Sequence, residues 1–108
     1  MTEAQLQQQI FKWYHNTFCT KSSEIQHVCF SVPNESSNAK EQIYKKSMGL
    51  ISGVSDLIVI QKNRILFIEV KTATGKQSEK QKSFQSKVEL LGFEYYVVRS
   101  LEDFKALI

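Results

Sequence analysis

Three charged residues near the middle of the chain have the types and spacing of a catalytic or metal-binding site. Glu69 and Lys71 follow the apolar run 65–68, and Asp56 lies thirteen residues before Glu69. Side chains alternate along a strand, so Glu69 and Lys71 should share one face. An unpaired buried charge is unfavourable, so these residues need oppositely charged partners, a metal ion or a wet cleft. We therefore predict a polar site at the end of this strand.

A predicted hairpin brings Asp56 to Glu69. The apolar runs 57–60 and 65–68 flank a polar segment in which Lys62-Asn63 can form a two-residue turn, because asparagine tolerates a left-handed backbone. Counting outward from this turn places Asp56 opposite Glu69 on the same face of the sheet. Opposed Cβ atoms in an antiparallel pair lie about 4.5–5.5 Å apart. Two carboxylates at that distance repel, and a divalent cation between them would remove the repulsion.

Helices and further strands should flank this hairpin. Thr2 with Gln5, and Ser78 with Gln81, resemble capping boxes that begin helices, and Gly49 and Gly92 are typical helix ends. Apolar side chains at helical spacing follow each box, with Phe84, Val88 and Leu91 forming the second stripe. The predicted elements are, in order, a helix over 3–19, a strand over 27–32 ending at Pro33-Asn34, a helix over 40–48, the hairpin, a helix over 79–91, a strand over 95–98 and a short helix capped by Ser100. This order predicts an α/β sandwich with a mixed central sheet.

The composition is that of one ordinary globular domain spanning residues 1–108. Of the 108 residues, 42% are hydrophobic and 23% are charged, and the net charge of +3 permits a polyanionic partner without requiring one. The two cysteines, Cys19 and Cys29, have neither metal-ligand spacing nor disulfide density. Neither a secretory leader nor a membrane-spanning apolar run is expected, which favours a cytoplasmic protein.

The motifs resemble the PD-(D/E)xK nuclease superfamily, in which an aspartate opens one strand and Glu-x-Lys lies on the next. Here these are Asp56 and Glu69-Val70-Lys71, with Ser55 at the place of the proline. More narrowly, the chain resembles the VRR-NUC (virus-type replication-repair nuclease) family. The segments that carry this resemblance are 32–35 (VPNE), 53–57 (GVSDL), 67–72 (FIEVKT), and Ser78 with Gln81.

The resemblance implies a restriction-endonuclease-like fold and a set of site residues. Mg²⁺, with Mn²⁺ as a substitute, would be held by Asp56, Glu69 and the Val70 carbonyl. Lys71 would position or deprotonate the attacking water, or neutralise the phosphate. Glu35 and Gln81 would join the catalytic set, although Glu35 can also be a solvated loop carboxylate and Gln81 a capping residue. The three central charges can also form a structural ion-pair cluster. Glu3, in the first predicted helix, reaches the site in related folds, but a carboxylate in the first turn of a helix is also favourable by itself.

The function implied is an endodeoxyribonuclease acting on branched DNA, with four-way junctions as the expected substrate and no nucleotide cofactor. Cutting both strands symmetrically calls for a homodimer. Lys76, Lys80 and Lys82 would contact DNA phosphates without reading sequence, unless they are only solvated surface residues. A phage-encoded origin suits the family. An inactive nucleic-acid-binding module and a nuclease subunit of a larger assembly are the alternatives, and the number of metal ions stays open.

Overall fold

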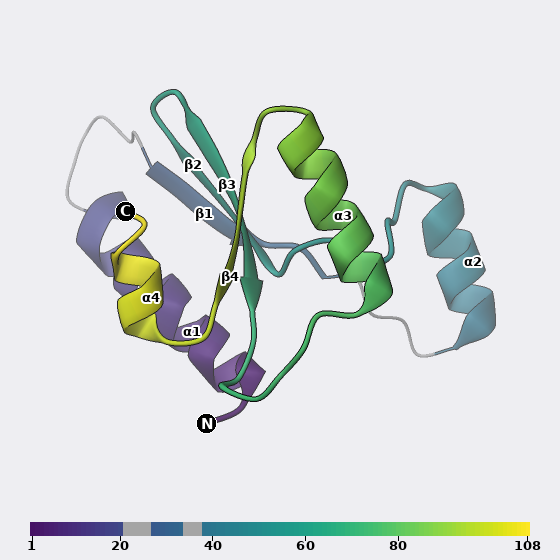
Figure 1. Ribbon diagram of the computed structural model, residues 1–108, viewed down its shortest axis with the longest axis horizontal. Coiled ribbons are helices and arrows are strands. Elements are labelled where there is room, and N and C mark those ends of the chain that lie inside the picture. Colours follow the sequence, from purple (N-terminus) through teal and green to yellow (C-terminus); the bar gives the residue numbers. More distant parts are fainter. Residues whose placement is uncertain (21–26, 34–37) are drawn as a thin grey trace.

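The order of helices and strands matches the one predicted from the sequence. The computed structural model describes residues 1–20, 27–33 and 38–108. The elements are α1 (Glu3–Tyr14), the π-helical η1 (His15–Cys19), β1 (His27–Ser31), α2 (Ala39–Ser47), β2 (Leu57–Gln61), β3 (Arg64–Val70), α3 (Glu79–Leu90), β4 (Glu94–Val98) and α4 (Leu101–Lys105) (Figure 1). Each predicted element is present, and apart from the C-terminal ends of the first and last helices the bounds lie within two residues of those expected.

The four strands form one mixed sheet in the order β1-β2-β3-β4. The β1–β2 and β2–β3 pairs are antiparallel, and β4 runs parallel to β3 after the crossover through α3. Asn63 has a φ of 62°, as the two-residue turn requires. The β2–β3 register pairs Gln61 with Arg64 and Leu57 with Ile68, so its continuation by one residue sets Asp56 opposite Glu69. The predicted hairpin register is confirmed.

Helices cover the two faces of the sheet unequally. α1 and α4 lie on one face (Figure 1), where Ile10, Val59 and Phe104 belong to a fully buried core cluster. α3 lies on the other face, and its Phe84 contacts the rings of Phe67 and Tyr95. Because residues alternate along β3, Glu69 shares the face of Phe67. The predicted polar site therefore lies on the side of the sheet that α3 covers.

Two local expectations were wrong in detail. The helix predicted over 3–19 continues to Cys19, but its last five residues are π-helical. The Thr17 hydroxyl donates to the carbonyl of Trp13, a side-chain-to-backbone bond that often bends helices. Leu91 was predicted to extend the buried stripe of α3, yet it is 74% exposed because the helix ends there, beyond the part that packs on the sheet.

α2 stands apart from the packed body of the molecule (Figure 1). It makes no close backbone contact with any other described helix or strand. Its start is fixed by Asn38, whose side chain accepts a hydrogen bond from the Glu41 backbone N–H at 2.7 Å. Gly49, with a φ of 107°, ends the helix as predicted. The position of α2 is therefore not explained by burial in the core.

An ion pair fastens the turn end of the hairpin to β4. The Arg64 guanidinium donates to both carboxylate oxygens of Glu94, at 2.8 and 2.7 Å, and the Tyr96 hydroxyl donates to Glu94 at 2.6 Å. Hydrogen bonds from Arg64 and then Tyr96 lower the pKa of Glu94 to about 2. Glu94 is therefore a carboxylate whose charged form is stabilised by its surroundings.

Among the residues that the structure describes, no helix combines the length and the apolar character needed to cross a bilayer.

Candidate active site

The loop that precedes Asp56 packs closely against α3 at a position where only glycine fits. Gly53 has a φ of 85°, and a Cβ atom there would lie 2.4 Å from the carbonyl carbon and oxygen of Lys80. Only glycine therefore permits the loop to rest on the backbone of the first turn of α3. This contact sets the distance between the Asp56 loop and the helix that carries Gln81.

Asp56 is held between two strands. Its carboxylate oxygen Oδ2 accepts a hydrogen bond from the Val70 backbone N–H at 2.7 Å. Its backbone carbonyl accepts another from the Val32 N–H at 2.9 Å, just beyond β1. The side chain is half-buried. Asp56 is therefore fixed against the last residues of β3, where Glu69 and Lys71 also lie.

Glu69 is 1% exposed and fully hydrogen-bonded. Its Oε1 accepts from the Gln81 side-chain amide at 2.9 Å, and its Oε2 accepts from the Tyr95 hydroxyl at 3.4 Å. The Gln81 oxygen accepts from the Ser78 backbone N–H at 2.8 Å, so its amide nitrogen must face Glu69. The predicted capping box is confirmed, and Gln81 also contacts Glu69.

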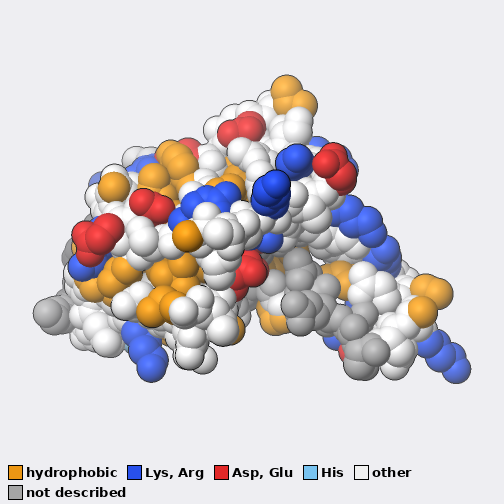
Figure 2. All heavy atoms as spheres, turned by 60° about the horizontal axis from the view of Figure 1, so that its bottom comes forward, with side chains coloured by type: hydrophobic (Ala, Val, Ile, Leu, Met, Phe, Trp, Pro, Cys, Tyr) orange, Lys and Arg blue, Asp and Glu red, His pale blue; other side chains and the backbone are white. Residues whose placement is uncertain are grey.

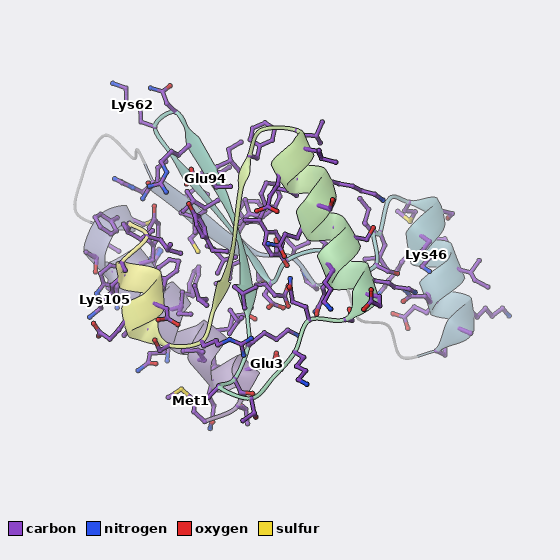
Figure 3. The ribbon with its side chains drawn as sticks, in the orientation of Figure 1. Met1, Glu3, Lys46, Lys62, Glu94 and Lys105 are labelled. Atoms are coloured by element: carbon purple, nitrogen blue, oxygen red, sulfur yellow. The ribbon has the colours of Figure 1, made fainter. Side chains whose placement is uncertain are left out.

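Lys71 lies between two carboxylates. Its Nζ is 3.7 Å from Oε1 of Glu69 and 3.7 Å from Oε1 of Glu3, and the residue is only 8% exposed. Glu3 reaches it from the first turn of α1 (Figure 3). Glu3 therefore lies at the cluster in addition to its place at a helix start. The nearly buried Lys71 ammonium therefore has oppositely charged partners before any ligand binds, while the carboxyl groups of the cluster outnumber it.

Two contacts at the cluster had no signal in the sequence pattern. The Tyr95 hydroxyl bonds Glu69 and also accepts from the Gln77 side chain at 3.3 Å. Arg99 donates to the carbonyls of Thr72 and Gly75, both at 2.7 Å, and so holds the loop that follows Lys71. The parallel pairing of β4 with β3 places both residues near the cluster. The register of that pairing cannot be derived by counting residues from a turn, because the long connection through α3 separates the two strands.

The electrostatics of the cluster favour a cation. Burial, followed by the nearby Asp56 carboxylate, raises the pKa of Glu69 to about 8. Burial also raises the pKa of Asp56, and the two carboxyl groups are within hydrogen-bonding range of each other. Holding both groups ionised therefore requires additional positive charge.

The donor set fits a hard divalent ion such as Mg²⁺. Within the described parts of the chain, no group of three or more His, Cys, Asp or Glu side chains could hold a metal. The cluster instead offers two carboxylates and backbone carbonyls. Mg²⁺ is typically bound by one or two carboxylates and keeps several waters, so a third acidic ligand is not needed.

The structure brings most of the predicted site residues together. Asp56, Glu69, Val70, Lys71 and Gln81 meet at the end of β3. Glu35 lies outside the described residues, so its predicted role is untested. The three predicted DNA-contacting lysines are all exposed: Lys76 in the loop before α3, Lys80 in the first turn of α3, and Lys82 on the outer face, 3.5 Å from Glu79.

Comparison with known proteins identifies the family. The family model described as the VRR-NUC domain matches residues 1–102, almost the whole chain. The chain belongs to the VRR-NUC domain family. A solved structure described as a VRR_NUC domain protein superposes with a TM-score of 0.76 at 19% sequence identity, over 99% of this chain and 84% of that one. A search of curated protein sequences found no match.

The family assignment confirms the resemblance drawn from the motifs, and the structural match confirms the α/β fold. The matched range includes every residue of the cluster, from Glu3 to Tyr95 and Arg99. The chain therefore carries a nuclease-type domain, and its cluster of buried charges lies within that domain.

Proposed function

We propose that this VRR-NUC domain is a Mg²⁺-dependent DNA endonuclease that hydrolyses phosphodiester bonds. The observation that carries the proposal is the carboxyl pair formed by Asp56, directly before β2, and Glu69 on β3, with the Lys71 ammonium 3.7 Å from Glu69. An ion-pair cluster that served only stability would gain little from a second carboxyl group that raises the pKa of the first. A shifted carboxyl pair of this kind is typical of functional sites.

Mg²⁺, with Mn²⁺ as a substitute, would be held by the carboxylates of Asp56 and Glu69 and by the Val70 carbonyl. When bound, such an ion polarises the phosphoryl oxygens and lowers the pKa of a bound water. The Val70 N–H already fixes Asp56, so the strand that offers the carbonyl also orients one carboxylate. We expect no nucleotide cofactor.

The remaining residues would act on water and phosphate. As an ammonium, Lys71 would position the attacking water or neutralise the phosphate; to deprotonate the water it would first have to give up its own proton. Glu3, 3.7 Å from its ammonium, would keep Lys71 oriented. Gln81 would be a positioning residue, because its amide fixes Glu69 and is itself fixed by Ser78. Glu35 stays a predicted member of the catalytic set.

We propose branched DNA, and four-way junctions in particular, as the substrate. The basis is the likeness of short VRR-NUC domains to structure-selective nucleases. Lys76, Lys80 and Lys82 would contact phosphates, which gives affinity without sequence preference.

We propose further that two copies of the chain associate. A two-fold interface pairs one surface with itself, so an apolar surface suits it better than a basic one. Val28, Phe30 and Ile60 offer such a surface, at 45%, 42% and 38% exposure. By register they lie on the same face as Phe67, but over β1 and β2, where α3 does not pack.

A cleavage panel with a mass measurement tests the proposal. The purified protein is given four-way junction, flap, single-stranded and linear duplex DNA, each with Mg²⁺, Mn²⁺ or a chelator. We expect metal-dependent cutting that is fastest on the junction, and the mass of two chains at the assay concentration. Cleavage that persists in the chelator would exclude the metal-dependent mechanism. Preference for linear duplex would exclude junction selectivity, and a single-chain mass would exclude the homodimer.

A further inference from the structure

Three lysines converge on one pocket between α2 and α3. This pocket, of about 300 Å³, is lined by Lys46 at the end of α2, by Lys80 and Lys87 of α3, and by Ser52 and Ser83. Among the residues that the structure describes, no acidic side chain lines it and none forms an ion pair with any of the three lysines. Three of the 14 lysines and arginines of the chain therefore line this one pocket.

The α3 side of the pocket follows from helical spacing. Lys80, Ser83 and Lys87 are three and four residues apart, so they lie on one face of the helix. Gln81 and Val88 point instead to the sheet, where Gln81 bonds Glu69 and Val88 is 6% exposed. One helix therefore presents one face to the candidate active site and an adjacent face to the lysine pocket.

α2 supplies the opposite wall. It has no close backbone contact with another described element, yet its last turn brings Lys46 to the pocket (Figure 3). Basic side chains, blue in Figure 2, lie along the side of the molecule that carries α3 and α2 in Figure 1. Like charges in a concave site repel each other and concentrate a positive field, which an anionic ligand relieves.

The pocket lies close to the carboxyl cluster, because two of its residues are near cluster residues along the chain. Ser52 in the pocket is four residues before Asp56, a span of at most about 14 Å for an extended chain. Lys80 in the pocket is the neighbour of Gln81, and its backbone packs on Gly53. Since B-DNA advances about 3.4 Å per nucleotide of each strand, the pocket lies within roughly four nucleotides of a phosphate at the cluster.

We propose that this lysine pocket binds backbone phosphates of the DNA strand that enters the active site, within a few nucleotides of the scissile bond. Lys46 and Lys87 would join Lys80 as phosphate-binding residues. That the bound polyanion is DNA rests on the proposed function. α2 would then form the outer side of the groove in which the DNA lies. Contacts of this kind bind all sequences alike.

Binding in the absence of metal tests the pocket separately from hydrolysis. The dissociation constant of a fluorescent four-way junction is measured by anisotropy in chelator, across a salt series, for the wild type, Lys46→Ala, Lys87→Ala and the double variant. We expect each single variant to weaken binding roughly three- to tenfold and to reduce the slope of log K against log salt by about 1. Lys46→Arg and Lys87→Arg should retain binding because the charge is kept.

Lys62→Ala is the matched control, since Lys62 is an exposed lysine at the hairpin tip, far from α2 (Figure 3). It should bind as the wild type does. Three results would each refute phosphate binding by the pocket: pocket variants that bind as tightly as the wild type does, a Lys62→Ala variant that loses as much affinity as they do, or a wild type that does not bind the junction. Displacement of the junction by inorganic phosphate at constant ionic strength would overturn the proposal in favour of a free anion. If the Lys46 and Lys87 variants bind the junction more weakly but the wild type cleaves no DNA, only the proposed hydrolysis is refuted.

Discussion

Replacing Glu69 by glutamine should abolish metal-dependent cleavage and, in the absence of metal, make the protein more stable. Cleavage should fall at least about 100-fold, because a carboxylate that would hold the metal is lost. Glutamine keeps the shape of the side chain: its oxygen can accept from Gln81, and its nitrogen would replace Oε2 beside the Tyr95 hydroxyl, which can accept as well as donate. It also removes the ionisation that burial and Asp56 oppose.

The gain in stability should depend on pH. The pKa of Glu69 is raised to about 8 from an ordinary 4.5, so the folded protein keeps this proton to a higher pH than the unfolded chain does. Wild-type stability should therefore fall as the pH rises from about 4.5 to about 8. The glutamine variant lacks this dependence, so its advantage should grow over that window. At pH 8 we expect a gain on the order of 2 kcal/mol, or roughly 10 °C in the melting temperature.

Thermal melts in chelator at several pH values measure this difference. Glu94→Gln is the matched control, because Arg64 and Tyr96 stabilise the charge of Glu94 and lower its pKa. That variant should lose stability at neutral pH and keep its cleavage. A Glu69→Gln protein that is less stable than the wild type at pH 8 would show that the Glu69 charge is well compensated without metal.

Gly53→Ala should destabilise the fold by about 3 kcal/mol and displace the Asp56 loop from α3. The new Cβ would lie 2.4 Å from backbone atoms of Lys80 and 2.7 Å from the Gln81 nitrogen, and neither can move without shifting the helix start. A left-handed alanine costs about 1 kcal/mol and the steric overlap about 1–3 kcal/mol. Cleavage should fall as well, since the loop positions Asp56 and the helix positions Glu69 through Gln81.

Gly49→Ala separates the two contributions. Gly49 also has a positive φ, of 107°, but a Cβ there would meet no atom within 4 Å. We expect it to lose about 1 kcal/mol and to keep its cleavage. Denaturant unfolding curves give both values. Equal losses of stability in the two variants would mean that the contact between Gly53 and Lys80 does not constrain the loop.

The sequence predicted the parts of the site that depend on local geometry. A two-residue turn at Asn63 fixes the antiparallel register by counting, so the approach of Asp56 to Glu69 could be derived residue by residue. Capping residues likewise marked the starts of α1 and α3, and with the latter the position of Gln81.

Contacts that depend on long-range packing could not be derived in this way. Tyr95 reaches Glu69 through a parallel pairing whose register is set by the packing of α3. The approach of Glu3 to Lys71 depends on how α1 crosses the sheet, and the lysine pocket depends on where α2 stands. The helical spacing also predicted that Leu91 belongs to the buried stripe of α3, whereas it is exposed. Spacing alone does not reveal where the sheet that covers the helix ends.

The rate of a single turnover on a labelled four-way junction tests the central claim most directly. The wild type and Lys71→Ala are compared with Mg²⁺ and with chelator, at protein concentrations that saturate the DNA, and a melt in chelator confirms that the variant is folded. We expect cleavage by the wild type only with Mg²⁺, and a rate two to four orders of magnitude lower, roughly, for Lys71→Ala. Wild-type cleavage in chelator, or an undiminished rate in a folded Lys71→Ala protein, would contradict a metal-dependent site built on Asp56, Glu69 and Lys71.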